Sequence, residues 1–360
     1  ITSNITITNI DNDFISKTLA LFSPQASQHW MTNLFKIELF SETGKADELS
    51  LPLFEHVLTK QKVPRNPHII ALEAKMHYYR NDSQHSQDLF EELRQTDPLC
   101  FDYLELYSNL LFVKEDVSAL SELSQSLAQI DKYRPETLAV SGNFYAINGC
   151  HEDAISNLAM ALRQDSSFAF VWTLIGHEFV ELENITAAMA AYSRAHEHNQ
   201  HDYRALYGLG RIYDMSKMTH HANVHYKNAA LVNPNDWRMW FALAITYEEL
   251  SEYDNSLVCF KKALTLKDCD IDVYFRIGVN YYNRSEEEIA AFYFEKYVNL
   301  SKPGSDGHLL SDIRVKDVKF AISKLKAYYT ELGNQAKIEE LEKTQTELES
   351  SFSEVDIISS

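Results

Sequence analysis

The most chemically suggestive run in the sequence is His177-Glu178-Phe179-Val180-Glu181. It begins like the HExxH motif of zinc proteases, but Glu181 stands where the second histidine ligand is required, so the motif fails. His221 and His225 lie four residues apart on an expected helix and are spaced to share a metal ion, yet no third ligand or general base accompanies them. We interpret this pair as part of a solvated helix face.

Two other features also fail to predict catalysis. Gly208-Leu209-Gly210 lacks the third glycine of a dinucleotide-binding loop. The four cysteines show no CxxC pair and no catalytic Cys/His ordering, which suits structural thiols in a reducing intracellular compartment. They are Cys100, Cys150, Cys259 and Cys269. We therefore expect a protein that is not an enzyme and that holds no cofactor and no metal.

The composition narrows the class of partner. The 33 basic and 52 acidic side chains give 33 − 52 = −19, a net charge that argues against nucleic acid as the main partner. No apolar run approaches the roughly 20 residues needed to cross a bilayer, and the start lacks a signal-peptide pattern, so we expect no membrane partner. The first residue is Ile1 rather than Met, which is typical of a fragment.

An internal repeat of 34 residues predicts the fold. A large residue recurs at this spacing, a small residue follows four positions later, and an aromatic residue follows after three more. The large residues are Leu138, Trp172, Leu206, Trp240 and Tyr274, the small ones Gly142, Gly176, Gly210, Ala244 and Gly278, and the aromatic ones Tyr145, Phe179, Tyr213, Tyr247 and Tyr281. Leu104 and Ile70 extend the same frame backwards, and Gly333 marks a last helix pair displaced by 14 residues.

The physical meaning of this template is an antiparallel helix pair, because the three positions share one helix face and the small residue lets a second helix approach. The pattern resembles the tetratricopeptide repeat, and it predicts an all-α fold of helix–turn–helix repeats stacked in a right-handed superhelical solenoid. We expect a lead over residues 1–27, about eight repeats over 28–300 that are strongest over 135–300, an inserted loop over 301–318, a capping helix pair over 319–349 and a flexible tail over 350–360.

Such a solenoid offers a concave groove lined by the first helix of each pair, where a peptide or partner helix is able to lie. Groove-facing positions bring carboxylates, amides and aromatic rings together, a lining suited to a peptide that carries Arg or Lys. Any one of these side chains is otherwise explained as keeping the solenoid folded and soluble. The candidate peptide-binding residues are Asn109, Asn143, His177, Glu178, Glu181, Tyr207 and Arg211.

Residues that helix packing does not require carry a more specific resemblance. The IDKYRPET junction, the run WTLIGHEFVEL and the run DYRALYGLGRIY closely resemble subunit eight of the anaphase-promoting complex, over roughly residues 28 to 300. The resemblance implies a non-catalytic scaffold subunit of a ubiquitin ligase, located in the nucleus and cytoplasm, whose partners are other subunits of the complex and a coactivator. It also implies that the family's first half, known for homodimerisation, is absent from this sequence.

The resemblance further implies where the coactivator binds. In the family, an Asn and a Glu on successive repeats hold the arginine of the coactivator's C-box. The Asn of SGNFY is Asn143 and the Glu of IGHEF is Glu178, and both lie on adjacent first helices. The competing hypothesis is a generic peptide adaptor or a co-chaperone that clamps an acidic chain end. Three arginines (204, 211 and 238) favour it, but five acidic groove residues (178, 181, 214, 248 and 249) outnumber them.

Overall fold

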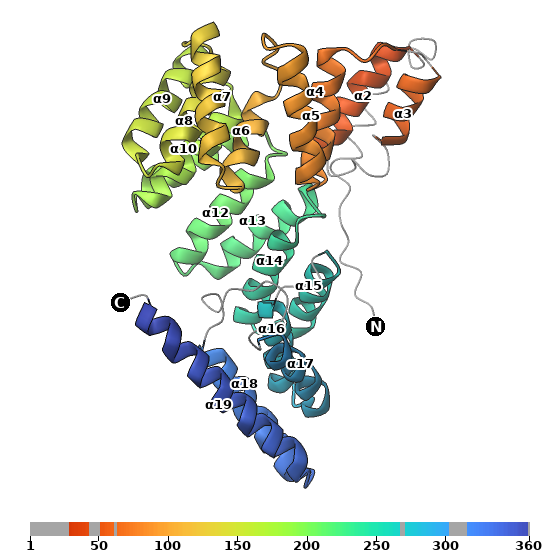
Figure 1. The fold of residues 1–360 in the computed structure, drawn as a ribbon, viewed down its shortest axis with the longest axis vertical. Coiled ribbons are helices and arrows are strands. Elements are labelled where there is room, and N and C mark those ends of the chain that lie inside the picture. Colours follow the sequence, from red (N-terminus) through yellow and green to blue (C-terminus); the bar gives the residue numbers. More distant parts are fainter. Residues whose placement is uncertain (1–28, 43–50, 61–62, 267–270, 302–314, 359–360) are drawn as a thin grey trace. The chain divides into compact units, whose positions relative to one another are not determined.

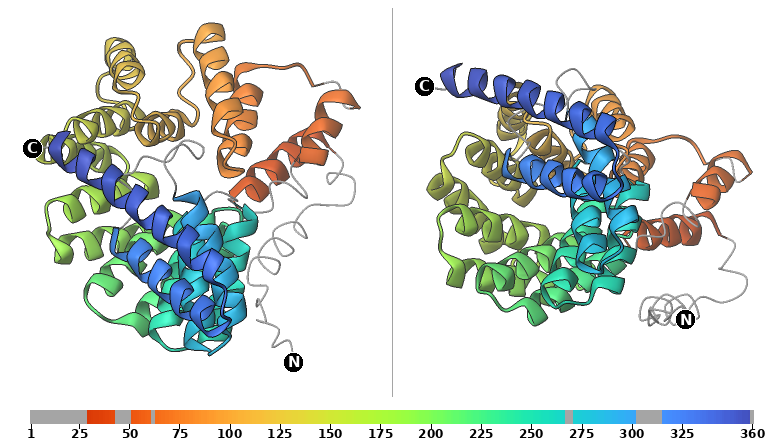
Figure 2. Two further views of the ribbon diagram at one scale, coloured as in Figure 1. Left: turned by 60° about the horizontal axis from the view of Figure 1, so that its bottom comes forward. Right: turned by 90° about the horizontal axis from the view of Figure 1, so that it is seen from below.

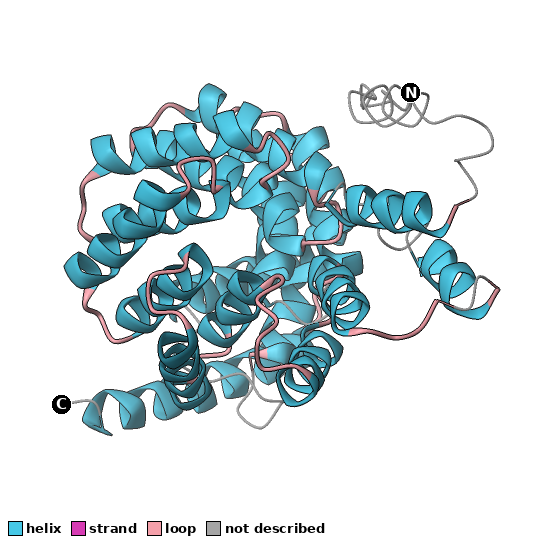
Figure 3. Ribbon diagram, turned by 90° about the horizontal axis from the view of Figure 1, so that it is seen from above, coloured by secondary structure: helices cyan, strands magenta, loops and turns pink. Residues whose placement is uncertain are grey.

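The computed structural model describes residues 29–42, 51–60, 63–266, 271–301 and 315–358. Every regular element within these ranges is an α-helix, eighteen in all, and no strand occurs among them (Figure 3). This confirms the predicted fold class. The predicted lead over residues 1–27, and residues 302–314 of the predicted loop, lie outside the described residues. No helix in the described part of the chain is long and apolar enough to cross a lipid bilayer.

The chain divides into two compact units, Ile1–Met239 and Trp240–Ser360. Unit 1 holds six helix pairs in chain order, drawn from red to green in Figure 1. They are α2 (Trp30–Glu42) with α3 (Leu51–Thr59), α4 (Pro67–Tyr79) with α5 (Ser83–Thr96), α6 (Leu104–Val113) with α7 (Val117–Ile130), α8 (Pro135–Ile147) with α9 (His151–Gln164), α10 (Ala169–Glu181) with α11 (Ile185–His198), and α12 (Tyr203–Met215) with α13 (Thr219–Val232).

Unit 2 continues the pairing. Its helices are α14 (Trp237–Glu249), whose first three residues still belong to unit 1, α15 (Tyr253–Leu266), α16 (Ile271–Asn283), α17 (Glu287–Leu300), α18 (Val315–Glu331) and α19 (Gln335–Ile358). The last helix corrects the sequence analysis, because α19 reaches Ile358 and residues 350–358 are helical where a flexible tail was predicted. No Gly or Pro interrupts this segment, so nothing in its sequence stops the helix. Likewise, α18 begins at Val315, four residues earlier than predicted.

The two helices of a pair lie side by side, as Figure 2 shows from two further directions. The small residue of each first helix explains how they approach so closely. A Cβ atom placed on Gly176 would stand 2.5 Å from the ring of Tyr192 on the second helix, and one on Gly210 would stand 2.6 Å from Tyr226. Contacts this short exclude any side chain, so the template glycines serve packing, as the sequence predicts.

The turn inside each pair repeats with the same period. Seven residues adopt a left-handed backbone conformation at intervals of 34, and the N–H of each next residue bonds to the carbonyl five positions before it, the pattern of a Schellman motif. They are Asn81, Glu115, Gly149, Glu183, Lys217, Ser251 and Ser285. The frame therefore covers the two degenerate repeats as well, and Gly333 repeats the geometry 14 residues out of phase, as predicted.

Candidate functional site

The first helices of the pairs in unit 1 line a cavity of about 850 Å³, which we call the groove. Its volume falls within the range of ligand-binding pockets in proteins. Side chains from α4, α6, α8, α10 and α12 line it, together with the first residues of α5, α7, α9 and α14 and the turns that follow α4 and α6. Those on the first helices lie on the same face of each helix because the 34-residue frame repeats without a slip over this region.

Six of the seven predicted peptide-binding residues line the groove: Asn109, Asn143, His177, Glu178, Glu181 and Tyr207. The seventh, Arg211, is exposed and does not line it. Arg211 occupies the same repeat position as Asn143 and His177, but an exposed site avoids the free-energy cost of desolvating its long charged side chain.

A chain of hydrogen bonds orients Asn143, which is buried. Its Nδ2 donates to Oγ of Ser108 over 2.8 Å, and Oγ of Ser108 donates in turn to the backbone carbonyl of Glu105. Because the Ser108 proton is already committed, Ser108 can only accept from Asn143, which fixes the amide nitrogen on that side. The amide oxygen of Asn143 is thereby left as the group that can accept a bond from a ligand.

Glu178 is the buried carboxylate of the groove. Its Oε2 lies 2.8 Å from Nδ1 of His151, the first residue of α9. Burial raises the pKa of Glu178, and the hydrogen bond from His151 offsets part of this rise. The contact with His151 uses one of the two carboxylate oxygens, and a carboxylate has about four acceptor sites, so it retains the capacity to take a guanidinium group.

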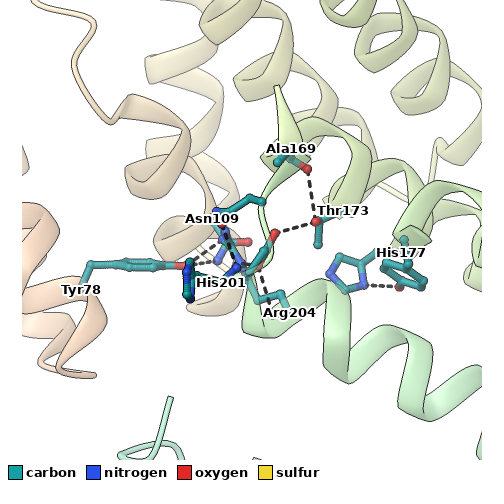
Figure 4. A network of polar contacts seen from close by, with 10 residues as sticks. Tyr78, Asn109, Ala169, Thr173, His177, His201 and Arg204 are labelled. Atoms are coloured by element: carbon teal, nitrogen blue, oxygen red, sulfur yellow. Dashed lines mark hydrogen bonds and ion pairs between the residues drawn. The ribbon is translucent and has the colours of Figure 1, made fainter. Parts of the chain in front are cut away.

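His177 is held as a neutral ring beside Glu178. Its Nδ1 lies 2.7 Å from the hydroxyl of Tyr192 (Figure 4), and the two rings meet edge to face. Burial, together with the positive charge of Arg204, lowers the pKa of His177 to about 4. At neutral pH the ring therefore adds no charge that would repel a cationic ligand.

A polar network crosses the groove between segments that are far apart in sequence. The hydroxyl of Tyr78 on α4 accepts a hydrogen bond from Nδ2 of Asn109 over 2.6 Å and lies 3.5 Å from Nη1 of Arg204 on α12 (Figure 4). Nδ2 of Asn81 also donates to the backbone carbonyl of Asn235 over 3.2 Å. These contacts join the early and late helix pairs of unit 1.

An apolar wall completes the lining at the turn between α6 and α7. Phe112, Val113 and Val117 line the groove there, and Val113 and Val117 are exposed to solvent. Exposed aliphatic side chains at the rim of a polar cavity are suited to contact an apolar residue of a bound chain. The groove thus combines an apolar rim with a buried amide and a buried carboxylate.

Several groove residues were not predicted as peptide-binding residues, and three of them, Tyr78, His151 and Arg204, make the polar contacts described above. Tyr78 occupies a groove position of the repeat frame, so applying the frame one repeat earlier would have found it. His151 lies on a second helix, and no repeat signal marks it. Arg204 was considered only for its charge. The aspartate two residues before it, Asp202, is the sequence feature that indicates a fixed orientation of its side chain, because the two form an ion pair.

Other sequence candidates do not form sites in the described part of the chain. The rings of His221 and His225 both stack on Tyr213, and no group of three or more potential metal ligands occurs among the described residues. Cys100, Cys150 and Cys259 are free thiols. Cys269 lies outside the described residues.

Two family models, both described as tetratricopeptide repeat, match residues 173–217 and 238–268. With the helix pairs described above, these matches show that the chain contains tetratricopeptide repeats. Among curated proteins, it is similar to anaphase-promoting complex subunit 8 of Arabidopsis thaliana, at 35% identity over 46% of this chain and 28% of the relative. It is also similar to anaphase-promoting complex subunit CDC23 of Saccharomyces cerevisiae, at 35% identity over 44% of this chain and 25% of the relative.

These relatives confirm the resemblance to subunit eight. The chain spans about a quarter of the length of the curated relatives it matches. Among solved structures, the crystal structure of the hetero-tetramer Cut9-Hcn1 of the anaphase-promoting complex aligns with a TM-score of 0.47 at 14% identity, covering 86% of this chain and 66% of that one. A likeness of this size carries no inference about function.

Proposed function

We propose that this chain is part of a non-catalytic scaffold subunit of the anaphase-promoting complex, and that its groove receives the arginine of a coactivator C-box. In this proposal its partners are other subunits of that complex and the coactivator, it acts in the nucleus and cytoplasm, and the full-length protein forms a homodimer. The similarity to subunit 8 supports the scaffold role. The observation that carries the arginine site is that Asn143 and Glu178 line one groove.

The chemistry of the two residues supports this ligand. A guanidinium group is a pure hydrogen-bond donor, so its site must present acceptors. Ser108 leaves the amide oxygen of Asn143 as such an acceptor, and Glu178 supplies a carboxylate whose burial strengthens its attraction for a cation. The net charge of −19 increases the rate at which a basic peptide approaches.

The test measures fluorescence anisotropy of a labelled C-box peptide with this protein. We expect saturable binding that weakens roughly tenfold or more with Glu178→Gln, and by a similar factor when the peptide arginine becomes alanine, since each change removes a charged hydrogen bond. Glu183→Gln, which alters an exposed carboxylate outside the groove, is the matched control and should leave affinity within about twofold. Equal affinity in all cases would refute the site.

A further inference from the structure

Two arginines of the groove share an unusual local arrangement. Arg204 and Arg238 are 34 residues apart, occupy the same repeat position, and both line the groove. Each follows a buried aspartate by two residues: Asp202 is 4% exposed and Asp236 is 2% exposed. Nε of Arg204 lies 3.1 Å from Oδ1 of Asp202, and Nη2 of Arg238 lies 2.6 Å from Oδ2 of Asp236.

The aspartates fix one edge of each guanidinium. Asp236 accepts from both Nε and Nη2 of Arg238, so its carboxylate occupies that edge and the opposite edge, with Nη1, retains donors. Arg204 is held further by the ring of Phe170, 4.6 Å from its guanidinium carbon, and Thr173 donates to Oδ2 of Asp202. Holding an arginine in one orientation removes most of the entropy cost that a ligand would otherwise meet.

The arginines and the acidic residues of the lining have different partners. Nη1 of Arg204 approaches Tyr78 at 3.5 Å, whereas Glu178 is paired with His151. Arg238 remains half exposed, at 50% of its side chain, despite its ion pair. Both ion pairs, in two successive repeats, place their arginine in the lining of the groove. A purely structural ion pair does not require this placement.

We propose that Arg204 and Arg238 form a second subsite of the groove, which binds a carboxylate side chain of the same peptide whose arginine lies at Asn143 and Glu178. This inference rests on the proposed function, because it adds a second contact to that occupant. It names the ligand class as a peptide that carries an acidic residue near its arginine. The two subsites then bind opposite charges on one peptide, which fixes the direction in which the peptide lies in the groove.

The local charge favours a carboxylate over a phosphate. Each arginine forms an ion pair with an aspartate, so the subsite offers oriented N–H donors rather than a strong positive field. A carboxylate matches the fork of an arginine with a single negative charge. A phosphate carries about two negative charges and would be repelled more strongly by the buried aspartates.

The test uses labelled C-box peptides in which one position at a time beside the arginine holds Glu, Gln or phosphoserine. At one position, Glu should bind roughly tenfold more tightly than Gln. This ratio should fall below about two with Arg238→Gln or Arg204→Lys, and should persist with Arg211→Gln, the arginine outside the groove. A ratio within twofold at every position, or one that survives both groove variants, would overturn the subsite, and tighter binding of phosphoserine than Glu would overturn the carboxylate assignment.

A second measurement separates failure of the subsite from failure of the proposed function. Acetate is titrated against the protein, with chloride at equal ionic strength as control, while the Nε–Hε signals of the arginines are followed by NMR. Saturable shifts of Arg204 and Arg238, without a shift of Arg211, support the subsite even when no C-box peptide binds. Absence of such shifts, together with an equal Glu and Gln series, rejects it while leaving the arginine site intact.

Discussion

The key side chains of the groove are oriented by hydrogen bonds to neighbouring residues of the protein. Asn143 offers its oxygen because Ser108 takes its nitrogen, and Glu178 holds its position because His151 is bonded to it. The repeat frame places Asn143 and Glu178 on adjacent first helices, and the resemblance to subunit eight implies that they share one site. It does not predict their supporting partners, because a hydrogen bond between two helix pairs depends on side-chain conformations that no periodicity encodes.

The clearest prediction for a single residue concerns His177. Its pKa of about 4 lies below the ordinary value of 6.5, so the folded state binds fewer protons than the unfolded state between these two pH values. This contribution to the free energy of unfolding is therefore complete above pH 6.5 and is lost as the pH falls toward 4. It amounts to at most about 3 kcal/mol.

NMR of the imidazole nitrogens checks this directly. His177 should remain neutral down to about pH 5, and the signal should vanish in His177→Gln, which also assigns it. The same variant should lose stability less steeply than the wild type as the pH falls from 6.5 to 4. An imidazole of His177 that titrates near pH 6.5 would contradict the account of a neutral, half-buried ring.

At the scale of elements, the turns inside the helix pairs carry a conformational free-energy cost, because most of them place a residue other than glycine in a left-handed conformation. Six of the seven in-phase turn positions hold a residue other than glycine in a left-handed conformation, and Gly149 is the exception. A side chain in this conformation costs roughly 1 kcal/mol relative to glycine. The Schellman hydrogen bonds and the packing of the helix pairs compensate this cost in each repeat.

Matched substitutions test the turns. Glu183→Gly should raise the denaturation midpoint, since it relieves the strain of an exposed left-handed residue, and Gly149→Ala should lower the free energy of unfolding by about 1 kcal/mol. Glu183→Ala retains a Cβ atom and serves as the control, with little expected change. Thermal and urea denaturation measure all three variants. Destabilisation by Glu183→Gly would show that the glutamate side chain makes a contact more valuable than the relief of strain.

The helices themselves are largely predictable from the 34-residue period, because large, small and aromatic positions alternate with the geometry of a helix pair. The contact between Tyr78 and Arg204 is not, although both lie in the frame. It joins residues 126 positions apart, and whether they meet depends on the small rotation between successive pairs, summed over several repeats. Similarly, the extent of α19 was missed because a polar segment without Gly or Pro is compatible with either a helix or a tail.

At the scale of the whole molecule, the proposed role of holding other chains rests on the tetratricopeptide repeats and on the acidic net charge. Unit 1 contains the groove, and its lining combines an apolar rim, a buried amide, a buried carboxylate and two oriented arginines. The chain spans about a quarter of the length of its curated relatives. Its place in the anaphase-promoting complex is therefore part of the proposed function.

The most direct test of the central claim is a double-mutant cycle between Glu178 and the arginine of the C-box peptide. Affinities are measured for wild type and Glu178→Gln, each with the arginine peptide and with its citrulline counterpart, which keeps the shape but removes the charge. If the two groups touch, the cycle should give a coupling energy of about 1.5 kcal/mol or more. A coupling energy near zero, with both single changes still weakening binding, would contradict the claim that Glu178 holds the arginine.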